Sequence, residues 1–139
     1  MKVLTKQEMD RLLDLAEEAR NHAYSPYSHY SVGAALLTAD GQVYQGCNIE
    51  NAGFTPTVCA ERTAFFKAVY DGHRAVRAIA VIATGEEQGF PCGVCRQVMA
   101  EFCDKDFLIV TANRDRSKVD VCTFEELLPH SFGPKDLGV

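Results

Sequence analysis

Three cysteines at the starts of two expected helices constrain this chain most. Cys92 and Cys95 have two residues between them, so one metal ion can bind both thiols at the first turn of one helix. Cys59 opens a second apolar stretch that is also expected to be helical. Helix N-termini stabilise thiolates through their free N–H groups and their dipole. We therefore expect a fold in which two helix N-termini converge on one point.

The six cysteines are better explained as reduced thiols than as three disulfides. The opening residues, MKVLTKQEMD, have no apolar core typical of a signal peptide, and no later stretch approaches the roughly 18 apolar residues of a membrane span. These features predict a cytoplasmic protein without membrane association, where thiols stay reduced. The spacing of Cys92 and Cys95 alone also occurs in redox dithiols and in zinc ribbons, so it does not identify the site by itself.

The number of metal ligands separates a structural zinc site from a catalytic one. Structural sites have four protein ligands, whereas catalytic sites have three and leave one position for water. Cys103 lies about 12 Å beyond Cys95 along the expected helix, and Cys122 lies in a separate expected strand. The distance of Cys47 is not fixed by the sequence. We expect an open site of Cys59, Cys92 and Cys95, with the other three cysteines as small buried side chains; a closed structural site is the alternative.

Glu61 and Arg62 favour the catalytic alternative. Glu61 lies two residues after Cys59 and so does not share its helix face, but it can reach water at the metal and accept a proton. An ordinary acidic residue in a first helical turn is the competing interpretation. Arg62 can donate to the thiolates and offset their excess negative charge, or it can form a surface salt bridge.

The expected elements alternate along the chain and predict an α/β fold. A three-layer α/β/α domain over residues 1–139 accounts for their order, with a mixed sheet of about five strands and parallel crossovers after residue 59. A capping box at Thr5–Glu8 and a helical apolar period mark the first helix, and Asp40-Gly41 is typical of a hairpin turn. The helices are expected to about residue 22 and over 59–70, 92–102 and a short stretch after Thr123 that Pro129 ends, and the strands over 32–38, 42–47, 76–83, 107–111 and 119–122.

Several motifs together resemble the small homotetrameric zinc-dependent cytidine deaminases. The zinc motif is CAE at 59–61 with PCGVC at 91–95. The further matching stretches are YSPYS at 24–28, VGAAL at 32–36, NIENA at 48–52, CRQV at 95–98 and LLP at 127–129. The resemblance covers roughly residues 22 to 137 and implies a cytidine-deaminase-like fold.

This resemblance implies a reaction and a set of roles. It implies hydrolysis of cytidine and 2′-deoxycytidine to uridine and 2′-deoxyuridine plus ammonia, as part of pyrimidine salvage, with one Zn²⁺ per subunit. Glu61 would move a proton from water to ring N3 and then to the departing amine. The N–H of Ala60 and the region of Cys92 would border the base. Asn48 and Glu50 would bind the ribose, in agreement with the rule that residues two apart in an extended segment share one face.

The resemblance also implies an assembly and shows some departures. Phe132 matches an aromatic residue that reaches the base from a neighbouring subunit, and Phe54 matches a position near a subunit contact, which implies a homotetramer with shared active sites. Tyr30 stands beside the substrate where phenylalanine is common, Ser31 stands where proline is common, and Phe90 stands where serine is common. These departures are expected to alter the shape of the pocket rather than the reaction.

Other functions fit the sequence less well. The net charge of −5 and the pI near 5.3 argue against a nucleic-acid polymer as substrate. The Asn48 and Glu50 pair suits a plain ribose and argues against an aminonucleoside-antibiotic deaminase. A zinc-stapled interaction module without chemistry predicts four protein ligands and no need for Glu61.

Overall fold

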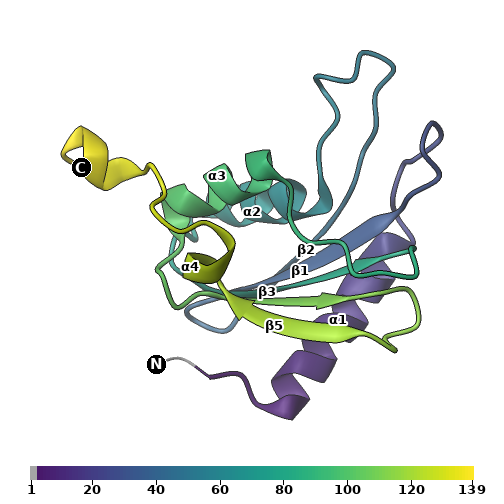
Figure 1. Cartoon of the computed structure of the whole chain (residues 1–139), viewed down its shortest axis with the longest axis horizontal. Helices are drawn as coiled ribbons and strands as arrows, with labels where there is room; N and C mark the ends of the chain where they lie inside the picture. Colours follow the sequence, from purple (N-terminus) through teal and green to yellow (C-terminus); the bar gives the residue numbers. More distant parts are fainter. Residues whose placement is uncertain (1–2) are drawn as a thin grey trace.

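The computed structural model describes residues 3–139 and contains a five-stranded sheet with helices on both faces (Figure 1). The strand order is β2-β1-β3-β4-β5. The strands are β1 (Val32–Thr38), β2 (Val43–Cys47), β3 (Val76–Ala83), β4 (Leu108–Ala112) and β5 (Val119–Thr123). The helices are α1 (Lys6–Arg20), α2 (Ala60–Tyr70), α3 (Gly93–Phe102), α4 (Phe124–Leu127) and a 3-10 helix, η1 (Pro134–Leu137).

The predicted elements are confirmed, with small differences at their ends. The capping box of α1 is present: the Thr5 hydroxyl accepts from the backbone N–H of Glu8, and the Glu8 carboxylate accepts from the backbone N–H of Thr5. Helix α1 ends at Arg20, two residues before the predicted end, because a turn follows it. The 3-10 helix η1 had no counterpart among the predicted elements.

The sheet is mixed, as predicted. Strand β1 is antiparallel to both β2 and β3, so β2 and β3 run in the same direction. Strand β4 is parallel to β3, and β5 returns antiparallel along the edge. The connections through α2 and α3 are therefore crossovers between strands of one direction, and both helices begin at the same edge of the sheet, which is where α/β folds place their sites.

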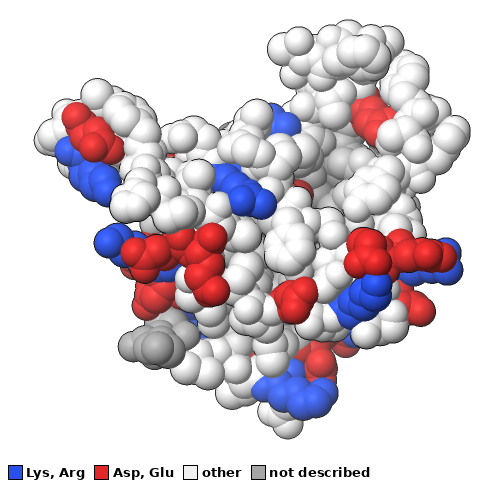
Figure 2. Space-filling model, viewed as in Figure 1, with Lys and Arg blue, Asp and Glu red and all other residues white. Residues whose placement is uncertain are grey.

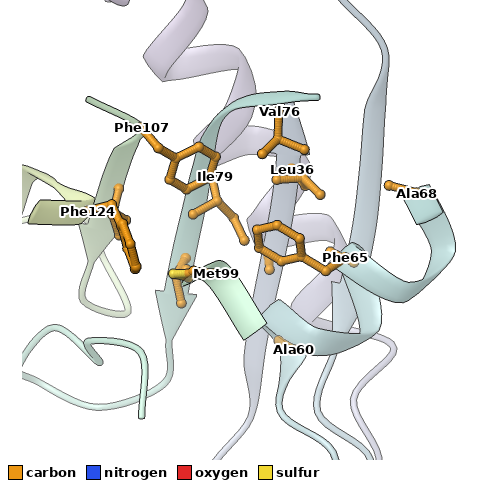
Figure 3. Close-up of a cluster of buried hydrophobic side chains, with 13 residues drawn as sticks. Leu36, Ala60, Phe65, Ala68, Val76, Ile79, Met99, Phe107 and Phe124 are labelled. Carbon is orange, nitrogen blue, oxygen red and sulfur yellow. The ribbon is translucent and has the colours of Figure 1, made fainter. Parts of the chain in front are cut away.

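Each face of the sheet has its own apolar core, and the two cores use alternate residues of β1 and β3. Helix α1 packs on one face against Ala35, Leu37 and neighbouring side chains. Helices α2 and α3 pack on the other face, where Phe65 of α2 and Met99 of α3 meet side chains of the sheet (Figure 3). The three layers therefore follow from the two-residue period of buried strands.

The prediction that Cys47, Cys103 and Cys122 are small buried side chains was wrong in its extent. Cys47, Cys103 and Cys122 are each only partly buried. Cys47 and Cys122 belong to the two outermost strands, β2 and β5, and Cys103 is the C-terminal cap of α3. Edge positions and helix ends keep one side open to solvent even when the other side packs against the core.

The charged side chains on the visible face of the molecule are mixed in sign (Figure 2). On the face in Figure 2, the Lys and Arg side chains lie among Asp and Glu side chains rather than in a continuous stripe. Within residues 3–139, no helix is long and apolar enough to cross a membrane.

Candidate active site

The three predicted ligands lie together at the start of α2 and α3. Cys59 and Cys92 are the N-terminal caps of these helices, and neither thiol caps its own helix by a hydrogen bond. The sulfur atoms of Cys59 and Cys92 are 3.6 Å apart, as are those of Cys92 and Cys95. All three sulfur atoms lie within 4.8 Å of one another. The convergence of two helix N-termini expected from the sequence is therefore present.

This arrangement fits zinc. Tetrahedral zinc with Zn–S bonds of about 2.3 Å holds its sulfur atoms about 3.8 Å apart, close to the spacing observed. Within residues 3–139, no fourth His, Cys, Asp or Glu joins this group of candidate ligands. Cys92 is exposed while Cys95 is buried, so the group opens to solvent on one side. The donor set matches a zinc site with one position free for water.

Arg62 lies against the thiols, as predicted. Its guanidinium Nη2 donates to the sulfur of Cys59 at 3.5 Å and to the carbonyl of Thr57 at 3.4 Å. Hydrogen bonds from the Cys95 thiol and then from Arg62 lower the pKa of Cys59 to about 5. The pKa of Cys95 is raised because its thiol donates to the Cys59 sulfur. The protein thus stabilises a thiolate at this point of the structure.

Glu61 is a buried carboxyl group in the first turn of α2. Only 5% of its surface is exposed, which is rare for glutamate. Burial, together with the nearby Cys59, raises the pKa of Glu61 to about 7. A carboxyl group with this pKa can both accept and donate a proton near neutral pH. An ordinary first-turn acid is usually solvated, so the burial of Glu61 favours the proposed role in proton transfer.

A cleft of about 330 Å³ lies over Glu61 and the thiols. This volume is within the range of small-molecule sites. Most of the predicted site residues line it together: Tyr30, Asn48, Glu50, Cys59, Ala60, Glu61 and Cys92. Figure 1 shows the two loops that contribute to it, joining α1 to β1 and β2 to α2, on the same side of the molecule as the N-termini of α2 and α3.

Asn48 and Glu50 line the same cleft, but both are also bound to the loop over residues 24–31. The Asn48 amide accepts from the backbone N–H of Val32 at 2.9 Å and donates to the carbonyl of Tyr30 at 2.8 Å. Glu50 accepts from the backbone N–H groups of Tyr27 and Ser28 and from the Ser28 hydroxyl. Ser28 was not among the residues predicted for the site; its only signal in the sequence was its place in the stretch YSPYS, which indicated a loop but no partner.

Tyr30 forms one wall of the cleft, and its hydroxyl lies close to Gly89. A Cβ atom on Gly89 would be only 2.8 Å from the Tyr30 hydroxyl, so the glycine leaves space for it. Burial, followed by the nearby Glu61, raises the pKa of Tyr30. Phe90 also lines the cleft. Two of the departures from the family pattern, Tyr30 and Phe90, therefore lie in the pocket itself.

Phe54 and Phe132 lie outside this cleft. Phe54 is 79% exposed and has a left-handed backbone (φ 53°), and it lines a neighbouring hollow with Glu50 and Ser28. Phe132 is 58% exposed, and its carbonyl accepts from the Gln97 side chain of α3 at 3.0 Å. A role for either ring at the base requires a second subunit, so it stays a prediction.

Comparisons with known proteins agree with this site. Residues 6–111 match the family model of the cytidine and deoxycytidylate deaminase zinc-binding region. The chain is 48% identical to a cytidine deaminase of Sporosarcina psychrophila, with 94% of this chain and 95% of the relative covered. It is 50% identical to a cytidine deaminase of Halalkalibacterium halodurans, with 93% and 98% covered.

A solved structure agrees in fold as well. The crystal structure of cytidine deaminase from Burkholderia pseudomallei superposes with a TM-score of 0.85 at 43% identity, covering 93% of this chain and all of that one. The family match includes the three cysteines, which lie at the spacing zinc requires. The chain belongs to the zinc-dependent cytidine and deoxycytidylate deaminase family.

Proposed function

We propose that this protein hydrolyses cytidine and 2′-deoxycytidine to uridine and 2′-deoxyuridine with release of ammonia. One observation carries the proposal: a buried carboxyl group, Glu61, lies beside three converging thiols on the wall of a cleft lined by Asn48 and Glu50. The cytidine deaminases similar to this chain match it over nearly its whole length. Pyrimidine salvage in the cytoplasm is the role we assign to this activity.

Cys59, Cys92 and Cys95 are the proposed zinc ligands, with one ion per subunit. When bound, zinc supplies a Lewis acid that makes water nucleophilic near neutral pH. Arg62 offsets the excess negative charge of three thiolates through its hydrogen bond to Cys59. The proposed role of Arg62 is to reduce the net negative charge of the zinc site while all three thiolates stay bound.

Glu61 is the proposed acid–base residue. It accepts a proton from the water that attacks C4 of the pyrimidine, and it delivers this proton to ring N3. It then takes the second proton from the hydroxyl group now on C4 and passes it to the amine, so that the C4 carbonyl forms as the C–N bond breaks and ammonia leaves. A pKa near 7 allows both halves of this cycle at neutral pH.

The remaining cleft residues bind the nucleoside. The Ala60 N–H, at the free start of α2, and the exposed side of Cys92 border the base, with Tyr30 against its ring. Glu50 accepts hydrogen bonds from sugar hydroxyl groups, since an ionised carboxylate only accepts. Asn48 lines the same cleft, and its side-chain amide keeps one N–H donor and one acceptor position unused by the bonds to Val32 and Tyr30.

An absorbance assay tests the activity. Cytidine is mixed with the protein and the loss of cytosine absorbance is followed, first with the parent and then with Glu61→Gln. We expect the variant to lose about 10² to 10⁴ in turnover, because general acid–base catalysis contributes about that much. Glu101→Gln, an exposed carboxylate on α3, is the matched control and should keep parental turnover. A parent that leaves cytidine intact would support the zinc-stapled interaction module instead.

We further propose a homotetramer in which Phe132 and Phe54 complete the site of a neighbouring subunit. Their exposure in the single chain supports this proposal. Mixing Glu61→Gln and Phe132→Ala subunits tests it, with the mass in solution measured by light scattering. If Phe132 acts across subunits, mixed assemblies contain sites with both native residues and regain activity. If both residues act within one chain, mixing restores nothing.

A further inference from the structure

The loop over residues 24–31 contacts the proposed sugar-binding carboxylate at three points. The Glu50 Oε1 atom accepts from the backbone N–H of Tyr27 at 3.0 Å and of Ser28 at 3.1 Å. The Glu50 Oε2 atom accepts from the Ser28 hydroxyl. Ser28 therefore binds both oxygens of one carboxylate, through its backbone and through its side chain.

The Ser28 hydroxyl also connects Glu50 to the rest of the cleft. It accepts from the backbone N–H of Tyr30 at 3.0 Å, and the Tyr30 carbonyl in turn accepts from the Asn48 amide at 2.8 Å. A continuous chain of hydrogen bonds thus runs from Glu50 through Ser28 and Tyr30 to Asn48. His29, between the two loop residues, has a left-handed backbone (φ 57°), which turns the chain so that one hydroxyl meets both partners.

These bonds fix the charge of Glu50 as well as its direction. The Ser28 hydroxyl and then the two backbone N–H groups keep the pKa of Glu50 below its usual value. With three acceptor positions already used, the carboxylate has little freedom to rotate, and its remaining acceptor capacity has a set direction. Hydrogen bonds to an ionised group are among the stronger ones in proteins.

We propose that Ser28 is a positioning residue for nucleoside binding: its hydroxyl orients the Glu50 carboxylate toward the sugar and links it to the Tyr30 and Asn48 wall of the cleft. This inference rests on the proposed function, in which Glu50 accepts from the sugar. Ser28 does not contact the proton-transfer residue Glu61 by any bond described above. Its removal should therefore weaken substrate binding and leave the chemical step intact.

Steady-state kinetics with three variants of the loop test the proposal. Ser28→Ala should raise KM for cytidine about tenfold, as expected for the loss of a hydrogen bond to a charged group, with kcat within about twofold of the parent. Ser28→Thr keeps a hydroxyl and should restore most of the KM. Ser25→Ala is the matched control: Ser25 bonds the Ser31 hydroxyl at 2.8 Å within the same loop but does not contact Glu50, and it should keep the parental KM. Because Ser28 is exposed, its truncation leaves the core unchanged.

A second substrate separates positioning from a general loosening of the loop. 2′,3′-Dideoxycytidine lacks both secondary hydroxyl groups of the sugar, so Ser28→Ala should change its KM or inhibition constant less than twofold. Equal losses with both nucleosides, an equal rise in KM for Ser25→Ala, or a parental KM in Ser28→Ala would each overturn the proposal. A parent enzyme that does not deaminate cytidine would instead remove the proposed function and this inference with it.

Discussion

Gly46 of β2 leaves the space that lets helix α2 pack closely against the sheet, and Gly46→Ala tests how strictly the site depends on this close packing. A Cβ atom at Gly46 would lie 2.3 Å from the carbonyl oxygen of Ala60 and 2.6 Å from the backbone nitrogen of Ala64. Ordinary contacts between carbon and oxygen are about 3.3 Å or longer. The helix backbone must therefore move away from β2 by roughly 1 Å, because neither clashing atom belongs to a flexible side chain.

The expected loss follows from this displacement. Overpacking of a well-packed region costs about 1–3 kcal/mol, and a clash with backbone belongs at the upper end. For a chain of 139 residues, about 3 kcal/mol lowers the Tm by roughly 10 °C. Helix α2 also carries Ala60 and Glu61 and is capped by Cys59, so the same shift misplaces the proposed acid–base group. A misplacement of about 1 Å can reduce turnover about 10²-fold.

Thermal unfolding, zinc content and cytidine turnover are measured together on Gly46→Ala. The control for stability is Gly93→Ala, since a Cβ at Gly93 meets no atom within 4 Å. We expect the control to keep the parental Tm or exceed it slightly. If Gly46→Ala unfolds within about 2 °C of the parent and turns over cytidine at the parental rate, close packing of α2 on β2 does not position the site.

Two further predictions follow from single contacts. Arg62→Gln should keep the fold but lower zinc retention or turnover about 10- to 100-fold, because Arg62 donates to the Cys59 thiolate. Elemental analysis of zinc content and the rate of cytidine turnover check this, with the exposed Arg74→Gln as the control. Parental zinc content together with parental turnover in Arg62→Gln would reject the prediction. Hydrogen bonds from the Arg77 side chain and then from the Thr5 backbone lower the pKa of Glu8. The ionised carboxylate therefore stabilises the fold at pH values above its unfolded pKa near 4.5, and this stabilisation is lost as the pH falls through the lower folded pKa. Glu8→Gln should therefore lower the Tm at pH 6, and its difference from the parent should shrink as the pH falls below 4.5; a constant difference at every pH would contradict this.

Local chemistry explains why so much of this protein could be predicted from its sequence. The capping box at Thr5 involves residues three apart, and it is present in the structure. The buried strands and the helix starts at Cys59 and Cys92 also depend on short patterns. The candidate metal site also follows from short patterns, namely the spacing of Cys92 and Cys95 and the place of Cys59 at a second helix start.

Contacts between distant segments could not be predicted in the same way. The sequence showed that Cys47, Cys103 and Cys122 are apolar enough to be buried, but edge strands and a helix end leave them partly open. The sheet order places β1 between β2 and β3, and no local pattern encodes that order. The partners of Glu50 also come from a loop more than twenty residues away.

The sequence by itself indicated the family and predicted the three candidate ligands and Glu61 as the proton-transfer residue, because these predictions depend on residue type and spacing. Only the tertiary structure decided that Glu61 is buried enough to have a pKa near 7 and that Ser28 binds the Glu50 carboxylate. The burial and the hydrogen bonds of a side chain depend on which remote segments pack against it. These segments become neighbours only when the sheet forms, so short sequence patterns do not predict them.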